Sequence, residues 1–173
     1  YHDTSNSIIK DAGTGRLQLL SNRLDINKSD GSEGMATFIE DAQVILYYDN
    51  NVKFQTTSTG ISVTGTALAT TDTDTTNTGN VTLDFGANQN FVLTLTGNVT
   101  LVNPSTEQVG QSGFITFIQD GTGGRTVSLG TDYETAGGAG LTLSSAASAT
   151  DVVPYIVVAS NRILLGTPQL AFS

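Results

Sequence analysis

The chain has 173 residues, enough for one domain of ordinary size or two small ones, and no cysteine, so neither a disulfide nor a thiolate metal site can brace its core. Its formal charge of −9 excludes the basic surface that a nucleic-acid partner requires. No run of about 18 apolar residues occurs, so we expect no membrane insertion. The first residue is Tyr1 rather than Met, and we expect a piece of a longer protein.

The first 66 residues are predicted to form short strands. Apolar and polar residues alternate in several brief runs, and no window shows apolar residues at helical spacing. The alternating runs are Leu17–Leu19, Leu24–Ile26, Val44–Tyr48, Val52–Phe54 and Ile61–Val63. Clusters rich in Gly, Asn, Asp and Ser predict turns at 11–15, 27–34, 49–51 and 58–60. A module of this size buries a modest core, which favours help from neighbouring subunits.

The remaining residues show a different pattern. Residues 67–80, ALATTDTDTTNTGN, have no hydrophobic rhythm and are predicted to be a Thr/Asp-rich linker. The pentapeptide GNVTL then occurs at 79–83 and again at 97–101, which suggests two related strand entries. The turn DGTGG between FITFIQ and RTVSL predicts a hairpin. VVPYIVVAS predicts a buried strand in which Pro154 marks an edge or a bulge.

These elements predict an all-β fold. We expect two small antiparallel β modules, residues 1–66 and residues 81–173, the second resembling a β-sandwich. Modules with many short strands leave ladder edges exposed, which proteins must cover or pair. Exposed edges and modest cores both favour help from neighbouring subunits.

Few residues could carry catalysis. His2 is the only histidine, and a solvated terminus explains it better than a catalytic role. Asp132 and Glu134 could share a strand face, as the paired carboxylates of a glycosidase must, but they lie among glycines in GTDYETAGGAG. We predict no catalytic residue, no cofactor and no enzymatic activity.

Metal and ligand sites have equally simple alternatives. Asp72 and Asp74 could hold a hard cation, although a polar linker explains them as well, and we predict no metal site. The adjacent Tyr47 and Tyr48 could stack on sugar rings, while the plainer interpretation packs one of them inward. Asp132, Tyr133 and Glu134 belong to a predicted loop tip at 131–140. The other predicted tips are 27–34 and the C-terminal TPQLAFS.

Two segments resemble virion proteins of tailed bacteriophages. The first joins SNSIIKDAGTGRLQLLSNRLDI to LYYDNNVKFQTTSTGISVTG, and departs from the phage pattern at Ile45, where an acidic residue is frequent. The second is FVLTLTGNVTLVNPSTEQVGQSGFITFIQDGTGGRTVSLG, which contains the elements GQSG, QDGTG and RTVS. Together they are similar to tail-fibre and other appendage proteins, especially those of marine phages.

The resemblance implies a non-enzymatic structural protein of the virion. Such a protein is a fibre or appendage subunit for host attachment, usually a homotrimer, assembled in the host cytoplasm. Its expected partners are other virion proteins and a receptor or glycan on the host cell. A capsid decoration protein remains an alternative of the same class. A bacterial surface adhesin or carbohydrate-binding module remains an alternative of another class.

Overall fold

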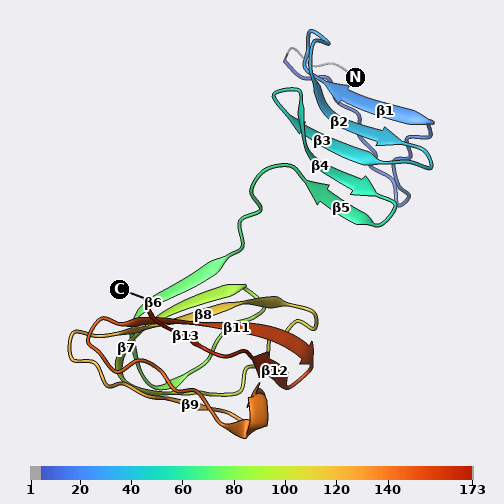
Figure 1. Ribbon diagram of the computed structural model, residues 1–173. Coiled ribbons are helices and arrows are strands. Elements are labelled where there is room, and N and C mark those ends of the chain that lie inside the picture. Colours follow the sequence, from blue (N-terminus) through green and yellow to red (C-terminus); the bar gives the residue numbers. More distant parts are fainter. Residues whose placement is uncertain (1–4, 173) are drawn as a thin grey trace. The chain divides into compact units, whose positions relative to one another are not determined.

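The computed structural model describes residues 5–172, and the chain separates into two compact units, residues 1–67 and residues 68–173 (Figure 1). Strands dominate both units. Among residues 5–172 the single helical element is a short 3₁₀ turn, η1 (Ala136–Gly138). The predicted all-β class is therefore confirmed. No helix in this part of the chain is long and apolar enough to cross a membrane.

Unit 1 is an antiparallel meander in which each strand pairs with the next along the chain. Its strands are β1 (Arg23–Asn27), β2 (Gly34–Ile39), β3 (Val44–Tyr48), β4 (Asn51–Thr57) and β5 (Gly60–Val63). Asp49 and Asn50 join β3 to β4 with φ angles of 50° and 58°, which suit a two-residue hairpin. The turn predicted at 49–51 is thus confirmed, because Asp and Asn tolerate positive φ.

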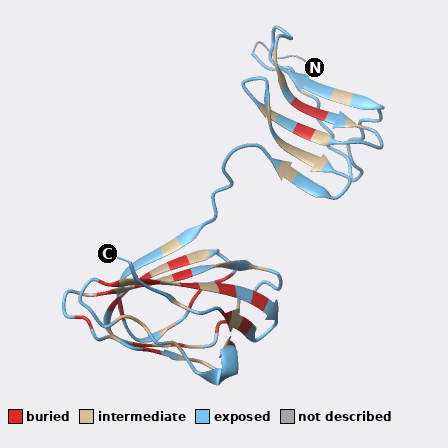
Figure 2. Cartoon of the chain, in the orientation of Figure 1, coloured by how far each residue is buried: buried red, intermediate tan, exposed pale blue. Residues whose placement is uncertain are grey.

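The core of unit 1 is thin. Among its described residues, only Ala36 and Ile45 are buried apolar side chains. Figure 2 accordingly shows little buried ribbon in this unit. A sheet buries an apolar face only when another layer packs on it. The described residues of unit 1 therefore leave most of their apolar side chains in contact with solvent.

Unit 2 is built on one mixed sheet in the strand order β10-β12-β11-β8-β7-β6, with β13 paired to β11 and β9 paired to β7. Its strands are β6 (Thr71–Val81), β7 (Asn90–Leu101), β8 (Ser112–Gln119), β9 (Val127–Leu129), β10 (Tyr133–Thr135), β11 (Thr150–Ala159), β12 (Arg162–Leu165) and β13 (Gln169–Phe172). The sheet is mixed because β7 runs parallel to β6, β8 and β9, and β10 runs parallel to β12. The antiparallel pairing expected for this module is found where β11 pairs with β8, β12 and β13. The parallel pairs were not expected, since alternation within a strand says nothing about the direction of its neighbour.

The predicted linker is also wrong over most of its length. Residues 71–80 belong to β6, the edge strand beside β7. Most β6 side chains are exposed, so the strand needs no hydrophobic alternation and shows none. The repeated GNVTL segments turn out to be neighbours in space, because Asn80 lies opposite Thr100 and Val81 lies opposite Leu101.

The predicted hairpin between β8 and β9 does not form. Both strands run parallel to β7, β8 beside residues 91–95 and β9 beside residues 99–101. Residues 120–126 form an excursion that leaves the sheet after β8 and returns as β9. The Asp-Gly signal shows where the chain bends, but it does not determine which strand becomes the neighbour.

The core of unit 2 gathers the inward side chains of the sheet and the segment after β6. Phe85 packs edge-on against Phe91 and Tyr155, with ring centroids 5.0 and 5.2 Å apart. Other fully buried side chains are Leu83, Leu93, Leu95, Val99, Leu101, Ile115, Phe117, Val153, Val157 and Ile163. Unit 2 thus has the complete apolar core that unit 1 lacks.

Pro154 lies inside the central strand β11 rather than at a sheet edge, which corrects the edge prediction. On the side of β11 opposite β8, Tyr155 pairs with Leu165 of β12 and Val152 pairs with Gln169 of β13. Pro154 falls between these two partners, and its carbonyl accepts from Gly166 N at 2.8 Å on that side. The break between β12 and β13 therefore accommodates the missing N–H of proline.

Candidate interaction surfaces

Tyr47 and Tyr48 do not form a joint aromatic platform. Neighbouring residues of a strand point to opposite faces of the sheet. Tyr47 is half-buried, and its ring lies close to Gly34, where an added Cβ would be 3.5 Å from the ring. Tyr48 is 74% exposed at the end of β3. Of the two rings, Tyr48 is therefore the one open to a ligand.

The candidates Asp132, Tyr133 and Glu134 lie at and beside the short strand β10, not on a free loop tip. Asp132 is buried, its N–H donates to Asn103 Oδ1 at 3.1 Å, and its carbonyl accepts from Ile163 N at 2.7 Å. Tyr133 is buried, and its hydroxyl has no hydrogen-bond partner among the described residues. Burial raises the pKa of Tyr133, and the carboxylates of Glu107 and Asp132 raise it further.

Glu134 forms a two-point ion pair with Arg162 on β12. The guanidinium Nε lies 2.8 Å from Glu134 Oε1, and the second nitrogen lies 3.1 Å from Oε2. These hydrogen bonds hold the pKa of Glu134 below its usual range. A glycosidase acid needs the opposite, a carboxyl whose pKa is raised so that it keeps its proton. The arrangement therefore fits a structural ion pair better than an acid catalyst.

A cleft opens beside β10. It has a volume of about 600 Å³ and is lined by β9, β10 and the residues Gly130, Gly138, Gly140 and Leu141. A second cleft of about 300 Å³ adjoins it and includes Ala136, Ala139 and Pro168. The lining combines small residues with apolar side chains such as Leu129, Leu141 and Leu165, and Glu134 is the one charged group among the described residues that form it. The predicted tip 131–140 thus contributes β10 and the exposed residues Ala136, Gly138, Ala139 and Gly140 to these two clefts.

The two weak metal-ligand candidates, Asp72 and Asp74, do not form part of a metal site among the described residues. Asp72 lies opposite Phe91 and Asp74 opposite Leu93, and Asp74 Oδ1 accepts from Thr76 N at 3.1 Å. Residues 5–172 contain no group of three or more His, Cys, Asp or Glu side chains that could hold a metal ion. His2 lies outside the described residues.

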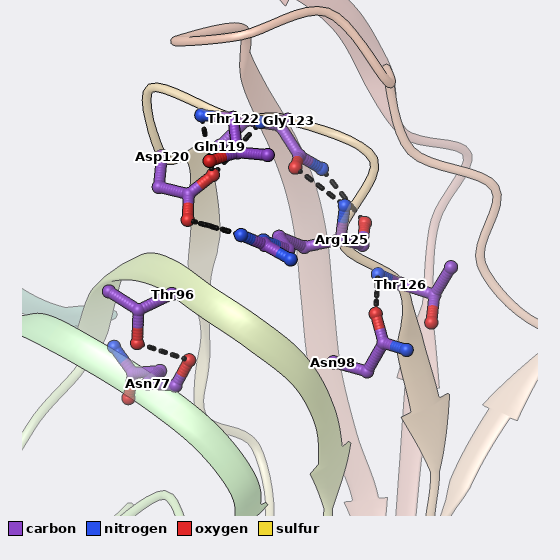
Figure 3. A network of polar contacts seen from close by, with 9 residues as sticks. All are labelled: Asn77, Thr96, Asn98, Gln119, Asp120, Thr122, Gly123, Arg125 and Thr126. Carbon is purple, nitrogen blue, oxygen red and sulfur yellow. Dashed lines mark hydrogen bonds and ion pairs between the residues drawn. The ribbon is translucent and has the colours of Figure 1, made fainter.

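The excursion between β8 and β9 is fixed by side chains that bond to the backbone (Figure 3). Gln119 Nε2 donates to Arg125 O at 2.9 Å, and Gln119 Oε1 accepts from Arg125 N at 2.8 Å. Asp120 accepts from the N–H groups of Thr122 and Gly123 and pairs with the Arg125 guanidinium at 2.8 Å. The Arg125 contact is the main reason why the pKa of Asp120 lies below its usual range. These hydrogen bonds and the ion pair therefore fix the backbone of the loop.

Hydrogen bonds also fix the two remaining predicted tips. In the loop at 27–34, Asp30 accepts from Ser32 N and Ser32 Oγ, and Lys28 pairs with Glu33 at 3.1 Å. The C-terminal tip contains β13, and Ala171 N donates to the buried Asp151 at 2.8 Å. The segment is therefore tied to β11 rather than free.

One surface was not foreseen from the sequence: an open apolar face on the sheet of unit 1. Residues directly opposite on paired antiparallel strands place their side chains on the same face. Register aligns Ile26, Ala36, Leu46, Phe54 and Val63 in one row across all five strands. A second row on this face contains Leu24, Phe38, Val44, Thr56 and Ile61. We call these ten residues the apolar face.

The opposite face is polar in its central row. That row is Asp25, Thr37, Ile45, Gln55 and Ser62. The signal for the apolar face was present in the alternation of each strand. The strand register was needed to show that the apolar positions of all five strands fall on one side.

The comparison with known proteins bears on unit 2. The model of a protein family described as "Putative phage tail fibre C-terminal domain" matches residues 70–159, which is more than half of the chain. The match extends from the start of β6 to the end of β11 and so contains most of the core described above. No curated protein and no solved structure matches the chain.

Proposed function

The chain belongs to the phage tail fibre C-terminal domain family, and we propose that it is a non-enzymatic fibre subunit that attaches the virion to the surface of a host cell. Membership makes it a structural fibre protein and a component of the virion. Host attachment, a homotrimeric state, contact with other virion proteins and assembly in the host cytoplasm are parts of the proposal. The observation that carries it is the family match across unit 2.

The build of unit 2 supports a binding role. Function in β scaffolds usually lies in loops that a rigid framework positions. Here the loop at 120–126 is fixed by Gln119, Asp120 and Arg125, and residues 136–140 border the clefts beside β10. The cleft lining offers small and apolar residues and a single charged group, Glu134, which suits an uncharged sugar chain better than a phosphate-rich one. We propose these clefts as the receptor contact.

The test uses the purified chain as a competitor. Host cells incubated with the chain should adsorb less of the phage that encodes it, because the chain occupies the receptor. Ala139→Arg should weaken this competition, since Ala139 is exposed and lines a cleft. Ala87→Arg is the matched control, an exposed loop alanine of unit 2 away from the clefts beside β10, and should compete like the wild type.

Two results would contradict the proposal. If neither the wild type nor its variants compete with the phage for adsorption, host attachment is ruled out. Release of reducing sugars from host envelope material, abolished by Glu134→Gln, would show an enzyme, because Glu134 would then supply a reacting carboxylate.

A further inference from the structure

Unit 1 lies outside the family match, and its apolar face has no assigned role. We propose that the apolar face binds the same face on further copies of this chain, so that unit 1 obtains its core by self-association. The inference rests on the self-association in the proposed function and assigns it a surface.

The apolar face of the single chain is mostly uncovered. In an ordinary sheet the apolar row is covered and the polar row meets water. In unit 1 the central row of the other face holds the buried residues Thr37 and Ile45. In the apolar row Ala36 is buried, whereas Ile26, Leu46 and Val63 are 43–44% exposed. Among the described residues, most of the apolar row therefore has no layer of the same chain packed on it.

The open apolar surface is smaller than one side of a standard interface. Ile61 is 67% exposed and Phe38 is 41% exposed on the same face. With Ile26, Leu46 and Val63, they leave on the order of 400 Å² of apolar surface, within the upper range of patches on monomeric soluble proteins. That is about half of what one partner contributes to a standard interface. Leu17, Leu19 and Leu20 of the same unit are also exposed.

Charge permits a second copy as the occupant. The chain carries −9, so two copies repel each other over most of their surface. None of the ten residues of the apolar face is charged, and the acidic Asp25 lies in the row on the other face. Copies can therefore meet here without opposing carboxylates.

Stoichiometry supports the same occupant. The thin core means that unit 1 depends on its partner for stability, because binding to the folded form alone shifts the folding equilibrium. Another copy is present wherever the chain is made. If the partner were a different virion protein, the apolar face of each new chain would stay exposed until the chain met that protein. A different virion protein is the competing occupant that the experiment must separate.

The first measurement is the mass of the full chain in solution, by light scattering after size exclusion. The wild type should form an oligomer, and Ile61→Asp should shift the mass toward the monomer of 18.0 kDa, because it places a charge in the apolar face. Met35→Asp is the matched control. Met35 is an apolar residue with 49% exposure on the other face of the same sheet, and its variant should keep the wild-type mass.

A second measurement covers the case in which Ile61→Asp fails to fold. The chain contains no cysteine, so Ile61→Cys and Met35→Cys each give a single reporter thiol. In the native assembly the thiol of Ile61→Cys should react with a maleimide about tenfold or more slowly than the thiol of Met35→Cys, because access controls thiol reactivity. In urea the two thiols should react at similar rates.

The outcomes separate the two proposals. In one outcome the wild type is oligomeric, the Ile61→Asp variant keeps its mass, and the Ile61→Cys thiol reacts as fast as the Met35→Cys thiol. This result would overturn the assigned face alone. A monomeric wild type with a fast-reacting Ile61→Cys thiol would overturn self-association, and would leave a different virion protein as the occupant. Competition for phage adsorption would still test host attachment in either case.

Discussion

At the scale of single residues, Asp151 is the most deeply buried carboxylate among the described residues of unit 2. It is 1% exposed, and it accepts hydrogen bonds from Ser144 N, Ser144 Oγ and Ala171 N at 2.6, 2.8 and 2.8 Å. Its side chain thus ties the segment before β11 and the C-terminal strand to one point. A buried acceptor of this kind is costly to change, because each donor it leaves behind has no water to replace it.

Asp151→Asn should therefore destabilise unit 2 by about 2–4 kcal/mol, since the amide keeps the shape but loses charge and presents a donor to other donors. Urea unfolding measures this loss, and proteolysis should show early cleavage near β13. Asp84→Asn is the control. Asp84 is exposed and its carboxylate accepts only from Gly86 N among the described groups, so the loss of stability in Asp84→Asn should be below about 1 kcal/mol. Equal losses of stability in Asp151→Asn and Asp84→Asn would show that Asp151 has no special role.

Asp120 gives a prediction about acid. Its pKa lies below the ordinary value of about 3.9 because it pairs with Arg125. A depressed folded-state pKa contributes stability that is complete above the unfolded-state pKa and is lost as the pH falls through the folded-state pKa. Asp120→Asn should thus lower the Tm at pH 7, and its difference from the wild type should shrink as the pH falls below about 4. A difference that is independent of pH, measured by calorimetry, would contradict this.

At the scale of elements, the loop at 120–126 offers a paired test of backbone conformation against space. Gly123 and Gly124 have φ angles of 75° and 73°, so alanine is strained at both. A Cβ on Gly123 would also lie 2.8 Å from Ala147 N and close to Ser145 O, whereas a Cβ on Gly124 would meet nothing within 4 Å.

Gly124→Ala should accordingly cost about 1 kcal/mol, and Gly123→Ala should cost at least about 2 kcal/mol more. Urea midpoints of the two variants measure the difference directly. Similar midpoints would mean that residues 145–147 can move away, and that the loop is less fixed than its hydrogen bonds indicate.

The edge strand β6 gives a prediction about aggregation. Asp72 is half-buried and Asp74 exposed, both opposite core residues of β7, and charged side chains on an edge strand discourage pairing with other chains. Replacing both with Val should raise light scattering at high protein concentration, while Thr73→Val, on the other side of the strand, should raise it less. If light scattering does not increase in the double variant, a feature other than these two carboxylates protects the edge.

The elements also show what a sequence can predict. The hairpin at Asp49 and Asn50 was predictable because its signal is local. The strand β6 was not, because an exposed edge strand needs no apolar rhythm, and the parallel neighbours of β7 depend on residues far apart in the chain. Likewise, Glu134 was predictable as a candidate side chain, but its ion pair with Arg162, 28 residues away, was not.

At the scale of the whole molecule, the two units differ in how they are stabilised. Unit 2 contains a closed cluster of buried side chains around Phe85, Phe91 and Tyr155, together with the hydrogen bonds that fix its loops. Unit 1 has a complete strand ladder but almost no core among its described residues. Backbone pairing alone contributes little net stability, because water satisfies the same groups in the unfolded chain.

The fragment 68–173 should therefore fold alone and unfold in urea in one cooperative step, at the midpoint that unit 2 shows in the full chain. The fragment 1–67 should be folded only when concentrated enough to associate, so its far-UV signal should depend on dilution. This dependence follows from the open apolar face, because the association that covers Ile26, Leu46 and Val63 is bimolecular or higher. A fragment 1–67 that stays folded and monomeric on dilution would show that the strand ladder suffices, and would contradict the dependence of unit 1 on its neighbours.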